Sequence, residues 1–223
     1  MAISKANING NPFIGAFCIA TDSYALIGNT AAEKSHAMVR KSLGVDAHSV
    51  SIDNSDLIGI YAVANSRAIL VPEIISQSEI ASMKRRLPGV RVETLATDLN
   101  ALGNNILAND SIAVVSPEFS EEETAEIGRK LQVKPLRMSF GGFNTVGANN
   151  VLTNKGMVLN NNASDEEMAA IKPHVKGVSQ STANLGSLSV RLSSIANSNG
   201  AILGQETTGF EIARIMEGLD LSD

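Results

Sequence analysis

The residues that could carry nucleophilic or metal chemistry are few, namely Cys18, His36, His48 and His174. A thiol nucleophile needs a neighbouring base, and a metal site needs several ligands at a suitable spacing. Cys18 lies in an apolar stretch, Ala16–Ile19, which is typical of a buried structural cysteine. No histidine is paired in the sequence with a second ligand at a metal-binding spacing, so we expect neither a catalytic centre nor a metal site.

Two further patterns could in principle bind phosphate or transfer protons. Gly141-Gly142-Phe143 is rich in glycine, but no Walker or dinucleotide pattern follows it, so a turn or bulge explains it better. Neighbouring acids such as Glu121-Glu122 and Asp165-Glu166 open predicted helices, where the helix dipole favours them. We therefore assign these acids no acid–base role and expect no cofactor.

The elements that position these residues repeat every 44 residues, and five repeats account for 220 of the 223 residues. A fixed period of this size indicates an array of similar structural units. The repeat leaves little chain for a second domain. The clearest columns are one of alanine and two of larger apolar residues: Ala37, Ala81, Ala125, Ala169, Ala213; Val39, Met83, Ile127, Ile171, Ile215; and Leu43, Leu87, Leu131, Val175, Leu219.

Each repeat contains one amphipathic helix. Four repeats open it with a capping box, in which a hydroxyl and a glutamate three residues later satisfy free backbone N–H groups. The first repeat lacks the box, and we expect Asn29 or Thr30 as its cap. The alanine column indicates close approach of the helix to a sheet, with plain helix propensity as the alternative. The four boxes are Ser76/Glu79, Ser120/Glu123, Ser164/Glu167 and Thr208/Glu211.

Two short apolar runs precede each helix, joined by residues that favour tight turns, and this layout predicts a β-hairpin. In the second repeat the first run is Ile58–Val63. A glycine recurs in this run every 44 residues, at Gly15, Gly59, Gly103 and Gly147. In the fifth repeat Gly186 follows after 39 residues, which predicts a hairpin region lengthened by a Ser-rich insertion of five residues.

A third β-like run follows each helix except the last, and residues 3–9 match the missing run in phase. We expect this N-terminal strand to close the array into a ring with the last repeat, which removes the exposed ends of an open array. The predicted fold class is α/β, a five-bladed, pseudo-fivefold propeller of ββαβ-type repeats. We expect residues 1–223 to form one domain.

Composition excludes several classes of function. The net charge of −5 and the pI of about 5.3 lack the overall basic character of nucleic-acid binders. One cysteine excludes an internal disulfide and fits a reducing cytoplasm, where we expect the protein to act. No apolar run approaches the roughly 20 residues of a membrane helix, and the N-terminus lacks a signal-peptide core. We expect a protein that does not bind membranes.

Asparagine is concentrated around the hairpins. Turn chemistry explains Asn65, Asn109 and Asn154, but not Asn104-Asn105 or Asn149-Asn150, which follow the repeat glycines. A polar rim at one end of a ring would suit a protein–protein interface of standard size, about 1,200–2,000 Å².

Three segments carry a resemblance to a known family: Ile58–Pro72, Ala101–Asp110 and Val146–Gly156. They resemble translation initiation factor 6, and the similarity extends over essentially the whole chain. It looks like the archaeal form of the family, because the chain stops at Asp223 without the C-terminal tail expected of the eukaryotic form.

The resemblance implies a pentein fold, no catalysis, and binding to the large (50S) ribosomal subunit so that joining of the small (30S) subunit is blocked sterically. It implies contact chiefly with ribosomal protein uL14 near the sarcin–ricin loop, with little direct contact to rRNA, and we expect the factor to act as a monomer. The resemblance places Gly15, Asn65 and Asn104 at or near that contact. Repeat equivalence alone adds Asn109, Asn149 and Asn154.

Two other functional interpretations remain compatible with the sequence. One is a pentein enzyme similar to amidinotransferases or arginine deiminases, but these need a catalytic cysteine in a late repeat and the only cysteine here, Cys18, is in the first. The other is a scaffolding propeller with a different partner.

Overall fold

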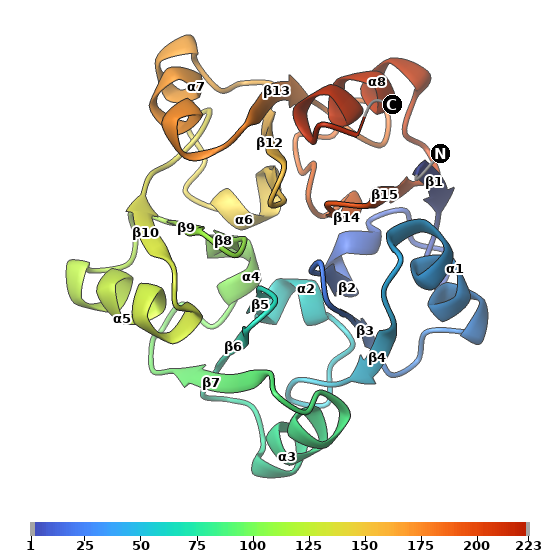
Figure 1. Cartoon of the computed structure of the whole chain (residues 1–223), viewed down its shortest axis with the longest axis vertical. Coiled ribbons are helices and arrows are strands. Elements are labelled where there is room, and N and C mark those ends of the chain that lie inside the picture. The colour runs from blue at the N-terminus through green and yellow to red at the C-terminus, as the bar shows by residue number, and fades with distance from the viewer. Residues whose placement is uncertain (1–2, 222–223) are drawn as a thin grey trace.

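The computed structural model describes residues 3–221, so residues 1, 2, 222 and 223 of the expected domain lie outside the described residues. Five similar units surround a central axis, each with one three-stranded sheet and one outer helix (Figure 1). The predicted α/β pseudo-fivefold architecture is confirmed. No helix within residues 3–221 combines the length and the apolar character needed to cross a bilayer.

Each sheet follows one plan. The first strand pairs antiparallel with the middle strand through a tight turn, and the third strand pairs parallel with it after the outer helix has crossed over. The sheet orders are β2-β3-β4, β5-β6-β7, β8-β9-β10, β11-β12-β13 and β14-β15-β1. The strands are β1 (Ile3–Ala6), β2 (Cys18–Ala20), β3 (Ala25–Gly28), β4 (Ala47–Val50), β5 (Val63–Ala64), β6 (Ala68–Pro72), β7 (Arg91–Leu95), β8 (Ile106–Ala108), β9 (Ile112–Val115), β10 (Lys134–Arg137), β11 (Val151–Leu152), β12 (Gly156–Asn160), β13 (Gly177–Ser181), β14 (Ser194–Asn197) and β15 (Gly200–Gly204).

The outer helices begin where the sequence predicts. All four capping boxes are present, with both the side-chain and the backbone hydrogen bond in place. The first repeat differs from expectation, because its cap is Ala32, without a side-chain hydrogen bond, rather than Asn29 or Thr30. The outer helices are α1 (Glu33–Leu43), α3 (Gln77–Arg86), α5 (Glu121–Leu131), α7 (Asp165–Ile171), followed by the 3-10 turn η2 (Lys172–His174), and α8 (Gly209–Gly218).

The hydrophobic core lies between each outer helix and the sheets beside it. The column that begins with Val39 and ends with Ile215 is fully buried at all five positions. The alanine column that begins with Ala37 is exposed at all five positions, so its predicted contact with a sheet is wrong. Helix propensity explains it, since alanine is the best helix former on a solvent-facing side.

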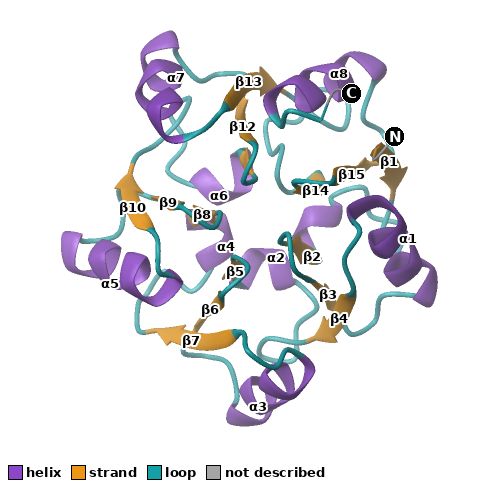
Figure 2. Cartoon of the chain, in the orientation of Figure 1, coloured by secondary structure: helices purple, strands orange, loops and turns teal. Residues whose placement is uncertain are grey.

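Short helices lie around the axis in addition to the first strands of the sheets (Figure 2). The run Ile58–Val63, expected as a strand, is helical to Tyr61, and β5 keeps only two residues. Ile58 and Ala62, four residues apart, are both fully buried, which is the spacing of one helix face. We call four elements the inner helices: η1 (Ile14–Ala16), α2 (Ile58–Tyr61), α4 (Leu102–Asn105) and α6 (Val146–Asn149).

The N-terminal strand β1 lies beside β15 in the last sheet. It pairs parallel with β15, with Ile3 opposite Ala201 and Ala6 opposite Gly204. The strand is shorter than the expected residues 3–9, because the chain turns after Ala6 and Ile8 forms an isolated bridge with Asn11. Residues from the two ends of the chain therefore share one sheet.

The capping glutamates also hold the loops that lead into the inner helices. Glu79 Oε1 accepts from the Asn54 N–H at 3.0 Å, and its Oε2 accepts from the Ser76 N–H at 3.0 Å and the Asp53 N–H at 3.2 Å. Asp53 and Asn54 have φ of 51° and 57°, a left-handed conformation that costs free energy for most residues. One carboxylate thus fixes the start of α3 and the strained entry to α2.

Removal of residues 1–9 is expected to lower the melting temperature by about 10 °C or more, because it leaves β15 paired only with β14, exposes its other edge and costs several kcal/mol of folding free energy. The measurement is thermal unfolding followed by circular dichroism. Lys5→Ala, a change at an exposed position of the same strand, is the control and should melt like the wild type. An unchanged melting temperature of the truncated chain would contradict the role assigned to β1.

The Glu79 carboxylate should make folding stability depend on pH. Its partial burial acts to raise its pKa, but hydrogen bonds from the Asn54 and Ser76 N–H groups and the Ser76 and Ser51 hydroxyls outweigh this and lower the pKa to about 2. A carboxylate whose pKa is lower in the folded state stabilises the protein above its unfolded pKa of about 4.3, and this contribution is lost as the pH falls towards 2.

We therefore expect Glu79→Gln to destabilise the protein at pH 7 and the difference from the wild type to shrink between pH 5 and pH 2. Urea unfolding at a series of pH values measures it. Glu73→Gln changes an exposed residue outside the helix and is the control. A Glu79→Gln difference that does not vary with pH would show that the charge of Glu79 is not what stabilises the loop.

Candidate functional site

The inner helices contact each other at the repeat glycines, where backbone packs directly against backbone. A Cβ on Gly59 would overlap the carbonyl oxygen of Gly15. In the same way, a Cβ on Gly103 would overlap the carbonyl of Gly59, and one on Gly147 that of Gly103. Glycine is required here because it alone allows two backbones to approach this closely.

The fifth member of this column is Arg191, which lies 44 residues after Gly147. A Cβ on Gly15 would overlap the Arg191 carbonyl oxygen, and the Gly15 N–H donates to the Leu192 carbonyl at 2.8 Å, so the ring of contacts continues through this residue. The predicted five-residue insertion in the fifth repeat is therefore wrong. That prediction matched glycine to glycine, whereas Gly186 lies in the loop before the inner segment and an arginine occupies the equivalent position.

The hairpin turns lie at the opposite end of the strands from the inner helices. At the same column in every repeat, a side-chain oxygen accepts hydrogen bonds from the backbone N–H groups two and three residues later. For Asn65 these donors are Arg67 at 2.9 Å and Ala68 at 3.0 Å. The five residues of this column are Thr21, Asn65, Asn109, Thr153 and Asn197.

The asparagines of this column also join neighbouring units. Asn65 Nδ2 donates to the Leu131 carbonyl at 2.8 Å and to the Asn109 carbonyl at 3.3 Å. Asn109 Nδ2 donates in turn to the Thr153 carbonyl at 2.9 Å. Asn65 is 1% exposed, so its amide is committed to the fold.

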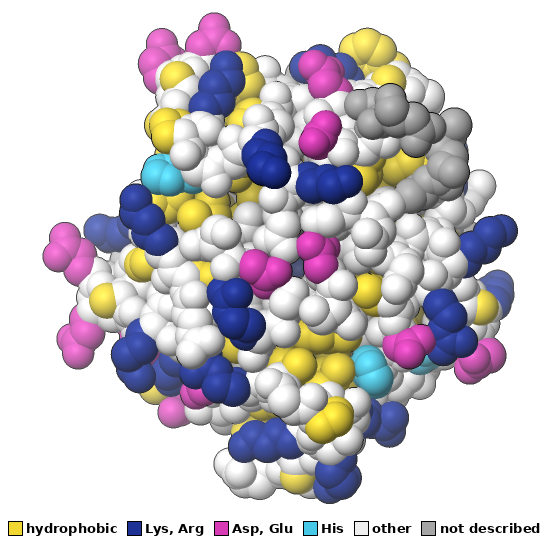
Figure 3. Space-filling model, viewed as in Figure 1, with side chains coloured by type: hydrophobic (Ala, Val, Ile, Leu, Met, Phe, Trp, Pro, Cys, Tyr) yellow, Lys and Arg dark blue, Asp and Glu magenta, His cyan; other side chains and the backbone are white. Residues whose placement is uncertain are grey.

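A polar cluster covers the hairpin end of the axis. Asp110 accepts from the Ser66 N–H at 2.8 Å and from the Ser66 hydroxyl at 2.9 Å. Asn154 Nδ2 donates to both Asp110 and Asp22, at 2.6 and 2.8 Å, and Asp22 accepts from the Ser198 hydroxyl. Acidic side chains gather at the middle of the face drawn in Figure 3, with basic side chains around them.

Two adjoining cavities lie along the axis between the two ends, and we call them the channel. Its inner part, a cavity of about 40 Å³, is lined by the first strands of the five sheets and by Arg191. Ligand pockets usually measure about 300–1,000 Å³, and a water molecule needs about 10–15 Å³, so this space holds a few waters rather than an organic substrate.

Two of the residues that could do chemistry, Cys18 and His36, are held in structural contacts. Cys18 is buried beside the channel, with its thiol 3.8 Å from the Ile19 carbonyl, and burial raises its pKa to about 12. The prediction of a buried structural cysteine is confirmed. His36 bonds the Ala47 carbonyl and the Ser49 hydroxyl. Within residues 3–221 no group of three or more His, Cys, Asp or Glu could hold a metal ion.

The six predicted contact residues lie at two different ends of the ring. Three of them, Gly15, Asn104 and Asn149, belong to the inner helices. The other three lie in the hairpin turns at the far ends of the first strands. Asn65 and Asn109 are buried there, whereas Asn154 is exposed. One flat contact cannot include both sets, since a first strand with its turn separates them by roughly 10 Å or more.

The inner-helix end has features that sequence reasoning missed. Phe13 and Leu57, the residues just before η1 and α2, are 37% and 36% exposed, and Asn104 beside them is partly exposed. Asn104 Oδ1 is itself buried and, within the described chain, has no hydrogen-bond partner. Exposed apolar residues with a polar surround are typical of a protein-binding surface. The sequence signal was available: Phe13 and Leu57 occupy one column, 44 residues apart.

The sequence was compared with protein-family models and with curated proteins. A family model described as the eIF-6 family matches residues 3–218. No curated protein matches the chain.

Gly59→Ala tests the contact between inner helices. We expect a loss of more than about 4 kcal/mol of unfolding free energy, or failure to fold, because the added methyl overlaps backbone that has no room to move. Urea unfolding measures it. Gly209→Ala is the matched control, since no atom lies within 4 Å of its added Cβ. Equal, small effects of the two changes would mean that the close approach is not required.

Proposed function

The chain belongs to the eIF-6 family, and we propose that its inner-helix end is the surface that binds the ribosome. As a member of this family, the protein is a translation initiation factor that binds the large ribosomal subunit and prevents its association with the small one. It is not an enzyme. The factor acts by occupying a surface that the small subunit needs, so that the two compete by mass action.

The choice of end rests on the burial and internal hydrogen bonding of the side chains at each end. At the hairpin end, Asn65 and Asn109 are buried and satisfied within the protein, and Asp22 and Asp110 bond their neighbours. At the inner-helix end, Phe13 and Leu57 expose apolar area. Apolar area with few competing internal bonds contributes more to binding than polar groups that are already paired.

This choice divides the six proposed contact residues. Asn104 is proposed to lie at or beside the contact. Asn149 is buried, accepts from the Thr145 hydroxyl and donates to the Leu188 carbonyl. Asn149 and Gly15 are therefore proposed to support the contact by holding the inner helices in place. Asn65, Asn109 and Asn154 are proposed to act indirectly, since their turns hold the strands that carry the inner helices. The rigid bonding between neighbouring units supports this indirect role.

The finer identity of the partner is also a proposal. We propose contact chiefly with ribosomal protein uL14 near the sarcin–ricin loop, by a single-domain monomer of the archaeal form acting in the cytoplasm. The net charge of −5 supports a protein contact over one with rRNA, because ribosomal proteins are generally basic and opposite charge speeds encounter.

Leu57→Glu tests the proposed end. We expect it to weaken binding to large subunits at least about tenfold, or 1.4 kcal/mol, because it places a charge within a desolvated contact. Co-sedimentation with purified large subunits, with a subunit-joining gradient alongside, measures the effect. The exposed position of Leu57 should leave the melting temperature close to that of the wild type.

Lys155→Glu is the control at the opposite end. It introduces the same residue at an exposed turn, and we expect wild-type binding and wild-type inhibition of joining. The opposite result, with Lys155→Glu impaired and Leu57→Glu normal, would assign the contact to the hairpin end. Co-sedimentation of the wild type with small subunits alone would contradict the function itself.

A further inference from the structure

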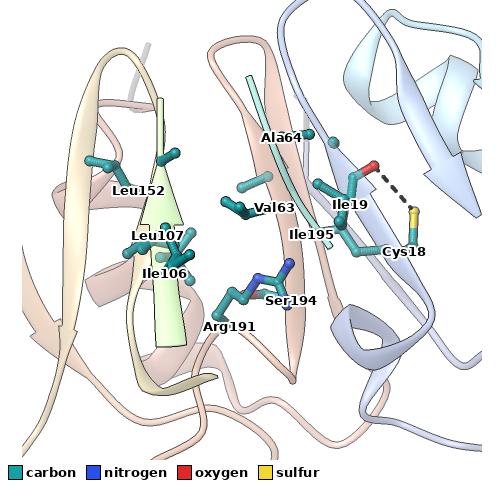
Figure 4. A pocket seen from close by; sticks show the side chains of 14 residues that line it. Cys18, Ile19, Val63, Ala64, Ile106, Leu107, Leu152, Arg191, Ser194 and Ile195 are labelled. Carbon is teal, nitrogen blue, oxygen red and sulfur yellow. Dashed lines mark hydrogen bonds between the residues drawn. The ribbon is translucent and has the colours of Figure 1, made fainter. Parts of the chain in front are cut away.

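The guanidinium of Arg191 lies in the central channel and is only partly satisfied by the protein. Its Nη1 donates to the Gly15 carbonyl at 3.3 Å and to the Gly59 carbonyl. Its Nε and Nη2 donate to no group within residues 3–221. Figure 4 shows the side chain pointing into the space between the first strands, beside Ser194.

No anionic group of the described chain neutralises this charge. None of the five ion pairs within residues 3–221 includes Arg191. Cys18 is the nearest candidate, but burial raises the pKa of its thiol to about 12, so it is a neutral thiol at pH 7. Burial lowers the pKa of Arg191 to about 10, which still leaves the guanidinium protonated at pH 7.

Arg191 is partly buried. A charge that has lost much of its water is costly, and proteins normally compensate it with an opposite charge or with several hydrogen bonds. Two backbone carbonyls reach one nitrogen of Arg191, and the remaining N–H groups face the cavity of about 40 Å³. That cavity has room for one small ion with a water molecule or two. Most of the other side chains that line it are apolar, including Ile106 and Leu107.

We propose that the Arg191 end of the channel is a binding site for one monovalent anion of about the size of chloride. The anion accepts hydrogen bonds from Nε and Nη2 and neutralises the guanidinium, while Nη1 remains bonded to the inner helices. The anion thereby stabilises the contacts that join the fifth repeat to the first and second.

The charges around the channel set the selectivity. Among residues 3–221, Arg191 is the only positively charged residue that lines the inner cavity. At the hairpin end, Asp22 and Asp110 line the continuation of the channel. A divalent anion would carry an uncompensated negative charge in the same channel as these carboxylates, so the site favours a single charge.

The other four repeats supply the matched comparison. They have glycine where the fifth has Arg191, so the site depends on one side chain. Arg191→Met keeps most of the length of the stem while removing the charge and every donor. Arg191→Gly restores the residue of the other repeats and serves if the methionine variant does not fold.

The experiment compares thermal unfolding of the wild type and Arg191→Met at constant ionic strength, with sodium gluconate replaced stepwise by sodium bromide. A ligand that binds only the folded state raises its stability by RT ln(1 + [L]/Kd), so the wild type should melt a few degrees higher in bromide, by roughly 3–5 °C per tenfold rise above Kd. The variant should show no such rise. Equal responses of the two proteins to bromide would overturn the proposal.

Bromide also gives a direct readout on the wild type that does not depend on any variant. Anomalous diffraction from crystals grown in sodium bromide should show a peak within hydrogen-bonding distance of Arg191 Nε and Nη2. An ordered channel without an anomalous peak at that position would overturn the proposal, whatever the melting data.

Discussion

The structure depends on the close approach of backbones around its axis. Each inner helix meets the carbonyl of its neighbour at a position where a side chain would overlap it, and four of these positions are glycine. This contact fixes the distance of every unit from the axis and therefore the width of the channel. The hydrogen bonds of the Asn65 column fix the units again at the hairpin end. Two rings of contacts, one at each end of the first strands, make five small units into one rigid body.

A rigid ring with a narrow channel suits a protein that works by occupying space. Its core is divided among the units, Cys18 is buried, and His36 is bonded to the backbone and to the Ser49 hydroxyl. Steric exclusion needs a firm surface that holds its position and a body too large to coexist with the competing subunit. The two ends of the ring differ in kind, since one is apolar around Phe13 and Leu57 while the other is acidic and internally bonded.

Much of the fold could be predicted because the repeat shows the same physical signals several times. The sequence correctly predicts the four capping boxes, the turn residues and the apolar side of the outer helices, because local hydrogen bonding and burial determine them. That apolar side includes the column Val39, Met83, Ile127, Ile171 and Ile215. The inner helices were read as strands, because a run of six residues such as Ile58–Val63 cannot distinguish one helical turn from a short strand. Arg191 was missed because its residue type differs from the column it occupies, and only a strict count of 44 identifies it. The contact residues could not be predicted as one surface. Sequence columns show which positions are equivalent between repeats, but they do not show at which end of the ring a position lies.

The central claim is that the inner-helix end of the ring faces the large ribosomal subunit. Hydroxyl-radical footprinting of the bound and free factor tests it on the unmodified protein. Binding should reduce oxidation of Phe13 and Leu57 strongly and leave the exposed hairpin residues around Lys155 as reactive as in the free protein. Protection around Lys155, with Phe13 and Leu57 unchanged, would contradict the account.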